Sequence, residues 1–161
     1  ASRLVPYKKT KLIVEAFNDM PDKKLVVIGS GEEYEEIKKI AKANVEVLGY
    51  QSDDVLKSHM QRSCAFVYAA VEDFGIVPIE AMACGTPVIA LNQGGTKETV
   101  VSGVNGVHFN EQTKQSIIDA VNRFETMKFD HEQISKFANS FNEDRFKLEI
   151  KEFVNSKLNC K

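Results

Sequence analysis

Short apolar runs alternate with amphipathic segments along the chain. Apolar runs of strand length lie at residues 24–28, 45–48, 65–68, 88–90 and 106–109, and the chain opens on a strand-like stretch, residues 1–5. Helical patterns begin near residue 8 and follow at 32–43, 52–61, 76–84, 96–101, 113–126, 131–139 and 143–158. Continuous apolar runs are typical of parallel strands covered on both faces. The alternation predicts an α/β fold with a doubly wound, Rossmann-like parallel sheet.

The length of 161 residues fits a single domain, 1–161, that is large enough to bury one core. Lys and Arg number 21 against 23 Asp and Glu, and the basic residues are spread along the chain. Nucleic acid is therefore not expected as a partner. The apolar runs are too short to span a membrane and no signal-peptide pattern is visible, so we expect a cytoplasmic location. The three cysteines lack metal-ligand spacing and are expected to be packing thiols.

The helical segment 76–84 contains a carboxylate in an otherwise apolar pattern. Its residues leave almost no polar face, which predicts a helix that is buried all round. Glu80 lies in its middle, and a buried unpaired carboxylate is costly. We therefore expect Glu80 to have a partner, either a basic side chain such as Arg62 or the hydroxyl groups of a ligand. This expectation directs attention to the loops around the helix.

The strand-to-helix loops of a parallel sheet gather at the carboxyl ends of its strands, where ligands bind. These loops carry cations, acids and glycines, namely Arg3, Lys8, 29–31, 49–50, 72–75 and 94–96. The helix starts at Gly75-Ile76 and Gly95-Thr96 have little side-chain bulk and can direct backbone N–H groups at an anion. Phosphate binding is therefore plausible in one crevice.

Charged side chains add to this crevice. Arg3 matches phosphate oxygens in a bidentate manner and Lys8 acts as a mobile charge. Glu80 can accept hydrogen bonds from ribose hydroxyls, and Glu72 and Asp73 from those of a sugar. The residues by themselves point to a nucleotide that carries a polyhydroxylated group.

A dinucleotide site is the alternative reading of Gly29-Ser-Gly31. The third glycine of that fingerprint would fall on Tyr34, and no acid closes the next strand. Several glutamates crowd the start of the following helix, where they would repel a pyrophosphate. We expect Gly31 to serve the tight turn first and a ligand second.

Two glutamates in E-x7-E spacing, Glu72 and Glu80, open a longer set of motifs. The set comprises 72–80, 81–88, 94–98, 2–8, 27–31 and 103–106, and it spans nearly the whole chain. Together these segments resemble the retaining nucleotide-sugar glycosyltransferases of the GT-B fold, family 4, also named glycosyl transferases group 1. The resemblance is to the C-terminal, donor-binding half of these enzymes.

The resemblance implies a role for each matching residue. Glu72 would be the catalytic residue, and the donor would contact Arg3, Lys8, Gly31, Tyr50, Asp73, Phe74, Gly75, Ile76, Glu80, Gly95 and Thr96. Within that set, Arg3 and Lys8 would bind the diphosphate, Glu80 the ribose, and Tyr50 would border the base. The pattern departs from the family at Lys9, where glycine is frequent, and at Thr96-Lys97, where an aliphatic-proline pair is common.

The resemblance also implies a donor and a partner domain. The opening residues 2–8 look most like mannosyltransferases that use GDP-mannose, which is favoured over UDP-sugars. No cofactor and no metal are expected, and no D-x-D motif occurs. The glycan or lipid-linked acceptor would bind an N-terminal domain outside these residues, and peripheral attachment to a membrane would be through that domain. We expect residues 1–161 alone to bind the donor without transferring sugar.

Two other functions fit the same fold. A non-catalytic nucleotide-binding module would not need Glu72, and a sugar-nucleotide epimerase would act without a separate acceptor. The last helical segment carries an apolar stripe over 146–154. We expect this stripe to join the core, and docking on a missing domain is the second interpretation.

Overall fold

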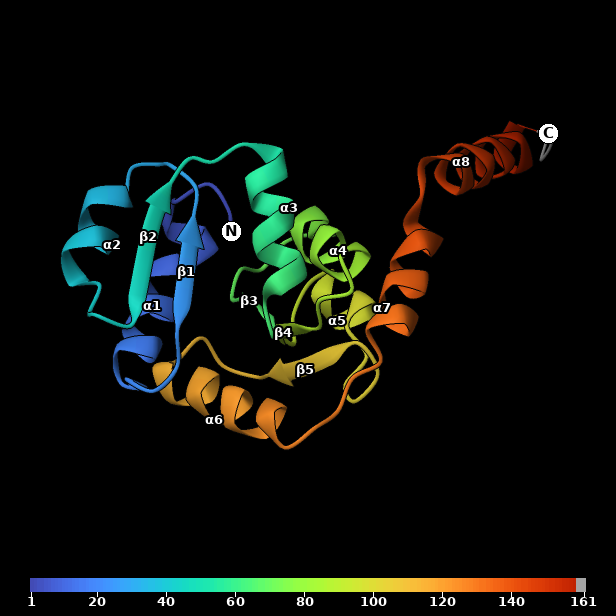
Figure 1. The fold of residues 1–161 in the computed structure, drawn as a ribbon. Helices are drawn as coiled ribbons and strands as arrows, with labels where there is room; N and C mark the ends of the chain where they lie inside the picture. Colours follow the sequence, from blue (N-terminus) through green and yellow to red (C-terminus); the bar gives the residue numbers. More distant parts are fainter. Residues whose placement is uncertain (159–161) are drawn as a thin grey trace.

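The computed structural model describes residues 1–158, so Cys160 lies outside the described residues. All of its strands run parallel. They are β1 (Leu25–Ile28), β2 (Val45–Gly49), β3 (Phe66–Tyr68), β4 (Val88–Leu91) and β5 (Gly106–Phe109). The strands form two hydrogen-bonded groups, β1-β2 and β3-β4-β5. The predicted α/β parallel fold is confirmed, although the hydrogen bonding divides the strands into two sheets (Figure 1).

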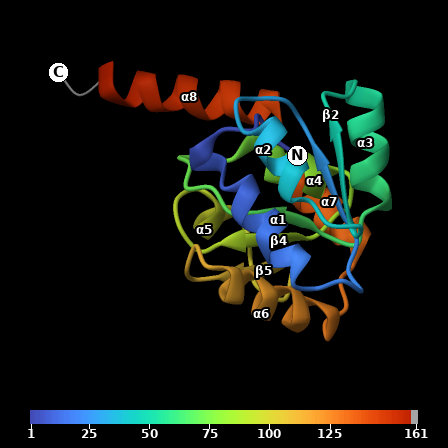
Figure 2. The same cartoon turned by 90° about the vertical axis from the view of Figure 1, so that its left-hand side faces the viewer.

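Helices connect the strands and cover both of their faces. The α-helices are α1 (Thr10–Asn18), α2 (Tyr34–Ile40), α3 (Asp53–Arg62), α4 (Ile76–Ala83), α5 (Thr96–Thr99), α6 (Lys114–Glu125), α7 (His131–Ala138) and α8 (Glu143–Leu158). Short 3-10 turns, η1 (Pro6–Lys8) and η2 (Asn139–Phe141), precede α1 and α8. Helices α1 and α6 pack together on one face, and α3, α4 and α7 on the other (Figures 1 and 2).

Each face has its own apolar cluster. The first is built around α1 and α6, with Val14 and Ile117 fully buried. The second is built around α4 and α7, with Met82 and Ile134 in its centre. Strand β4 lies between the two clusters and is buried at every position. Its run of Val, Ile, Ala and Leu suits a strand covered on both faces.

The opening segment is not the strand that the sequence suggested. Residues 1–5 have no strand assignment, although the N–H groups of Ser2 and Leu4 donate to the carbonyls of Ile28 and Ser30, at 3.1 and 2.9 Å. Two glycines let this segment lie against the loop after β1. A Cβ on Gly29 would meet the carbonyl oxygen of Ser2 at 1.8 Å, and one on Gly31 would meet that of Leu4 at 2.2 Å.

The expected role of the last helix in the core is wrong. No residue of α8 is buried, and the helix runs away from the rest of the molecule (Figures 1 and 2). Phe146 and Phe153, which the apolar pattern placed in the core, are 65% and 59% exposed. No neighbouring element of the described chain covers the apolar residues of α8. The sequence pattern shows that a helix has an apolar side, but it does not show whether another element covers that side.

Among residues 1–158, no helix combines the length and the apolar character needed to cross a membrane.

Candidate functional site

The acidic loop after β3 and the glycine turn after β4 are joined through their backbones. The N–H of Gly95 donates to the carbonyl of Glu72 at 2.7 Å. A Cβ on Gly94 would meet the same carbonyl oxygen at 2.3 Å, and one on Gly95 would meet the carbonyl oxygen of Phe74 at 2.4 Å. Any side chain at either glycine would push the loops apart. The two loops that the sequence assigned to one crevice are therefore in direct contact.

Glu72 is held by a lysine and a tyrosine. Lys8 Nζ forms an ion pair with Oε1 of Glu72, and the Tyr68 hydroxyl donates to Oε2 of the same carboxylate. Lys8 Nζ also donates to the Tyr68 hydroxyl at 3.3 Å. The side chains of Lys8 and Glu72 are 11% and 23% exposed, so the pair is partly shielded from water but can still be reached.

The structure thus brings together Lys8 and Glu72, which lie 64 residues apart in the sequence. The sequence interpretation overlooked Tyr68, whose hydroxyl completes the cluster. Tyr68 is the last residue of the apolar strand β3, and its ring is buried. A tyrosine that ends a buried strand needs a partner for its hydroxyl, and the acidic loop four residues later could have been recognised as that partner.

Thr96 has a structural role in the same turn. Its side chain is buried, and its hydroxyl donates to the carbonyls of Leu91 and Gln93 at 2.7 and 2.9 Å. The hydroxyl therefore fixes the turn at the end of β4. A ligand beside this turn would meet backbone groups and not this hydroxyl.

The expected burial of Glu80 is wrong. Glu80 is exposed, and it lies on α4 in an exposed stripe with Ile76 and Ala83. Helix α4 buries only the face that carries Pro78, Ile79, Ala81 and Met82. The exposed face of α4 carries apolar Ile76 and Ala83 beside Glu80, so the sequence of this helix indicated no polar face. No partner for Glu80 is present in residues 1–158, and an exposed carboxylate needs none.

The alternative partner for Glu80, Arg62, is engaged elsewhere. Arg62 Nε donates to the Ser58 carbonyl within α3, at 3.1 Å. The buried ion pair considered from the sequence is therefore absent from the described part of the chain. Glu80 remains available on the surface beside the acidic loop.

Several predicted donor residues lie on the surface. Arg3 and Asp73 are exposed, and Tyr50 is 76% exposed just after β2. The ring of Phe74 packs against Phe141, with centroids 5.6 Å apart. Gly75 precedes α4 with φ of 84°, a left-handed conformation that favours glycine.

A second carboxylate lies near the opening segment. Glu33 precedes α2, and its Oε2 is buried without a hydrogen-bond partner in residues 1–158. Burial, followed by the charge of Glu36, raises the pKa of Glu33 above its ordinary value of 4.5. The same residue anchors the backbone, since its N–H donates to the Leu4 carbonyl at 3.1 Å.

Within residues 1–158, no three His, Cys, Asp or Glu side chains are grouped in a way that could hold a metal ion. The described thiols, Cys64 and Cys84, are both free. Cys64 is exposed, so it is not the packing thiol that was expected, whereas Cys84 is partly buried and burial raises its pKa.

The glycine turn and the acidic loop belong to a known sequence pattern. The family model described as glycosyl transferases group 1 matches residues 1–141. This chain belongs to that family. The match includes Glu72, Glu80 and the turn at 94–96, and it ends before α8.

Curated relatives of this chain are much longer than it is. An uncharacterized glycosyltransferase of Methanocaldococcus jannaschii is 34% identical over 85% of this chain and 41% of its own length. A lipopolysaccharide 1,2-N-acetylglucosaminetransferase of Salmonella typhimurium is 34% identical over 87% and 42%. A GDP-mannose-dependent phosphatidylinositol monomannoside mannosyltransferase of Mycolicibacterium smegmatis is 31% identical over 74% and 36%. The chain spans less than half of each.

Solved structures share the fold over nearly the whole chain. Sucrose-phosphate synthase from Thermosynechococcus elongatus superposes with a TM-score of 0.84, at 22% identity, over 100% of this chain and 45% of that one. The Anabaena protein HepE, solved in complex with UDP-glucose, gives a TM-score of 0.74 at 26% identity, over 99% and 47%. The fold is that of one Rossmann-like half of a GT-B glycosyltransferase.

We expect Glu72→Ala to lower the free energy of unfolding by about 2 kcal/mol, because Lys8 would keep a partly buried charge without its carboxylate. The matched control is Glu36→Ala, which breaks an exposed ion pair with Lys11 and should have a much smaller effect. Urea unfolding of both variants measures the difference. Equal losses would show that the Lys8–Glu72 pair behaves as an ordinary surface pair.

Glu33→Gln should flatten the pH dependence of stability. Since folding raises the pKa of Glu33, the folded state binds its proton more tightly, and stability is lost as pH rises above the ordinary value of 4.5. Glutamine cannot ionise, so the melting temperature should fall less between about pH 4 and about pH 7. Glu35→Gln, at an exposed position in the first turn of α2, is the control. Parallel melting curves for the two variants would contradict the prediction.

Proposed function

We propose that this chain is the donor-binding half of a glycosyltransferase that transfers a hexose from a nucleoside diphosphate sugar. The observation that carries the proposal is the convergence of Lys8, Tyr68 and Glu72 beside the glycine turn at 94–96. Such a position, beyond the carboxyl ends of β3 and β4, is where parallel α/β sheets bind ligands. Membership of the family supports the proposal.

The ion pair suggests how the donor is received. Lys8 and Glu72 neutralise each other in their ion pair. A diphosphate would compete for Lys8, and the exposed guanidinium of Arg3 can supply bidentate hydrogen bonds to the same oxygens. Glu72 would then turn part of its hydrogen-bonding capacity to the hydroxyl groups of the sugar, while Tyr68 keeps the carboxylate in place.

The nucleoside would lie over exposed residues next to this cluster. Glu80 and Ile76 share the exposed stripe of α4, where a carboxylate and an apolar side chain can meet a ribose. Tyr50 presents a largely exposed ring just after β2 on which a base can stack. In this assignment Gly31, Asp73, Phe74, Gly75, Gly95 and Thr96 shape the walls of the site, mainly through their backbones.

GDP-mannose is the donor that we propose. Its support is the opening motif at 2–8 and the mycobacterial relative that uses GDP-mannose. UDP-sugars are the competing class, since HepE is solved with UDP-glucose and the Salmonella relative is an N-acetylglucosaminetransferase. Transfer with retention of configuration, without a cofactor or a metal, and a cytoplasmic location complete the proposal.

The acceptor belongs to the part of the relatives that this chain does not match. We place the glycan or lipid-linked acceptor on a second, N-terminal domain that faces the glycine turn across a cleft. Residues 1–161 by themselves would then bind the donor and leave it intact. The acceptor class is open within glycans and lipid-linked glycans.

Calorimetry with GDP, UDP and ADP tests the donor site on this chain. We expect GDP to bind most tightly and Glu80→Ala to weaken it by about tenfold, which corresponds to about 1.4 kcal/mol. Glu132→Ala is the matched control, because Glu132 is also an exposed helical glutamate, on α7, where it pairs with Lys136. Tighter binding of UDP would refute the mannosyl donor, and equal affinities for the Glu80 and Glu132 variants would refute the role of Glu80.

Kinetics in the longer, acceptor-bearing polypeptide test the catalytic assignment. Glu72→Ala should lower kcat by at least about a hundredfold with a smaller change in KM for the donor, since the carboxylate acts on the reacting sugar. Arg3→Ala should mainly raise KM, because the guanidinium binds the diphosphate equally in ground and transition states. If both variants change kcat and KM to the same small extent, neither assignment stands.

A further inference from the structure

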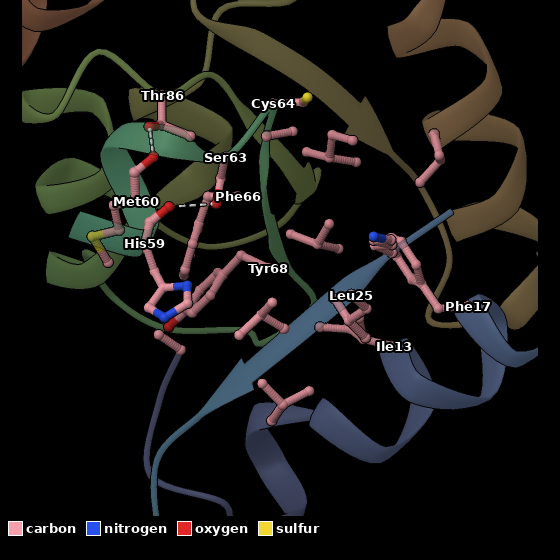
Figure 3. A pocket seen from close by; sticks show the side chains of 18 of the residues that line it. Ile13, Phe17, Leu25, His59, Met60, Ser63, Cys64, Phe66, Tyr68 and Thr86 are labelled. Atoms are coloured by element: carbon pink, nitrogen blue, oxygen red, sulfur yellow. Dashed lines mark hydrogen bonds between the residues drawn. The ribbon is translucent and has the colours of Figure 1, made fainter. Parts of the chain in front are cut away.

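The acidic loop, residues 72–75, is held by hydrogen bonds at one end only. Glu72 accepts hydrogen bonds from the Gly95 N–H at its carbonyl and from the Tyr68 hydroxyl at its carboxylate. Tyr68 is firmly placed, since it belongs to β3 and lines a cavity together with residues of β1 (Figure 3). Within residues 1–158, no backbone hydrogen bond reaches residues 73–75. The position of this second part of the loop therefore depends on packing.

Phe74 provides that packing from the middle of the loop. Its backbone lies against the glycine turn, since a Cβ on Gly95 would collide with the carbonyl oxygen of Phe74. Its ring contacts Phe141 of η2, with centroids 5.6 Å apart and the ring planes at 58°. Tilted aromatic pairs at such distances attract each other beyond the effect of their contact area. Phe74 is thus held by both the glycine turn and η2.

Phe141 is itself held by a second ring. Phe137, near the end of α7, packs against it edge-on, with centroids 5.5 Å apart and 63° between the planes. Phe137 is partly buried against the apolar cluster around α4 and α7. The Ser140 hydroxyl donates to the Phe137 carbonyl at 2.7 Å, which ties η2 to the end of α7. Phe137, Phe141 and Phe74 form a continuous row, which we call the aromatic row, from this cluster to the acidic loop.

Helix α7 brings the aromatic row to the loop because it lies along α4. The His131 ring donates from Nδ1 to the Gly85 carbonyl at 2.8 Å, and the Ser135 hydroxyl donates to the Ala83 carbonyl at 2.9 Å. Both carbonyls lie at or just beyond the end of α4. The two helices pack together (Figures 1 and 2). Since α7 begins beside the end of α4 and η2 reaches Phe74, just before α4, the two helices run in opposite directions.

The first turn of α8 also contacts η2. Asn142 caps this helix, and its side-chain oxygen accepts from the Arg145 N–H at 2.8 Å. The Arg145 guanidinium donates to the Ser140 carbonyl at 2.7 Å and pairs with Glu149 along α8. Hydrogen bonds thus connect η2 to the start of a helix that buries none of its own residues.

We propose that Phe141 is a positioning residue of the donor site, which acts through Phe74 on the acidic loop. The inference rests on the proposed function, since that function assigns the loop to the transferred sugar. The Phe141 ring keeps residues 73–75 against the glycine turn, so the loop is in place before the sugar binds. Arg145 connects this support to α8. Such preorganisation strengthens sugar binding, because less of the chain has to be ordered on binding.

Positioning differs from ordinary burial in what it predicts. Phe74 and Phe141 are 42% and 37% exposed, so neither ring is part of the core. Rings that remain this open contribute less burial than a fully covered side chain such as Met82. Removal of the Phe141 ring should therefore affect the acidic loop more than the stability of the whole domain.

Amide hydrogen exchange tests this support without any nucleotide. Phe141→Ala should speed exchange at Gly95, whose N–H donates to the acidic loop, by at least about tenfold. The amide of Ile89 in β4, a strand buried at every position, should be unchanged. Phe141→Tyr keeps the ring and should exchange like the parent chain. Phe146→Ala is the matched control, because Phe146 is an exposed phenylalanine of α8 outside the aromatic row.

Exchange at Gly95 also tests the connection to α8. Arg145→Ala removes the hydrogen bond to Ser140 and should speed this exchange by about threefold. Lys147→Ala is the matched control, because Lys147 forms a similar exposed ion pair on α8, with Glu143. Equal rates for the two variants would overturn the connection between α8 and the loop.

Calorimetry with GDP and GDP-mannose tests the consequence for the donor. Phe141→Ala should weaken GDP-mannose binding by at least about fivefold and GDP binding by less than about twofold, since the sugar is the part that meets the acidic loop. Phe146→Ala should change neither affinity. If UDP binds the parent chain more tightly than GDP, UDP and UDP-glucose are compared in the same way.

Three results would contradict a positioning role for Phe141. They are unchanged exchange at Gly95 in Phe141→Ala, equally faster exchange at Gly95 and Ile89, and an equal loss of affinity for the nucleotide and its sugar. If Phe141→Ala does not fold, Phe141→Leu removes the ring but keeps apolar bulk, and the same outcomes decide. Failure of the parent chain to bind either ligand would refute the proposed function, whereas the exchange rates would still show whether Phe141 holds the loop.

Discussion

The contact between the acidic loop and the glycine turn sets the geometry on which the candidate site depends. Because Gly94 and Gly95 have no Cβ atoms, the glycine turn can lie directly against the backbone of the acidic loop. The Gly95 N–H donates a hydrogen bond to the Glu72 carbonyl. The backbone of Glu72 is thereby fixed, and its carboxylate is positioned by Lys8 and Tyr68. Backbone and side-chain contacts together hold a carboxylate in a defined place even though it lies on a loop.

Much of the fold follows from the sequence, because continuous apolar runs and amphipathic segments have few alternatives in a parallel α/β domain. The five strands and the helices from α1 to α7 lie close to their expected places. The position of α8 could not be predicted, since its apolar residues do not reveal whether another surface covers them. The division into two sheets was also not predicted, because the pairing of β1 with β3 depends on tertiary structure and not on the local sequence pattern.

The sequence predicted which loops meet at the site. It did not predict which of the site's side chains are exposed and which are buried. Lys8 lies in the turn after the opening segment and Glu72 lies in the loop after β3, and the two side chains meet as an ion pair. Glu80 was misjudged because the residues around it are apolar, although α4 turns Ile76 outward with it. Tyr68 was missed because a tyrosine in an apolar strand looks like a core residue, and only its hydroxyl distinguishes it.

Helix α8 is rich in large apolar side chains but contributes none of them to the core. It buries none of its residues, so it adds nothing to the packed interior, yet it exposes large apolar side chains such as Phe146, Phe153 and Leu158. Exposed apolar side chains of this size favour association with another surface, whereas a helix without buried residues contributes little to a packed core. We therefore expect changes on α8 to alter the solubility of the chain more than its free energy of unfolding.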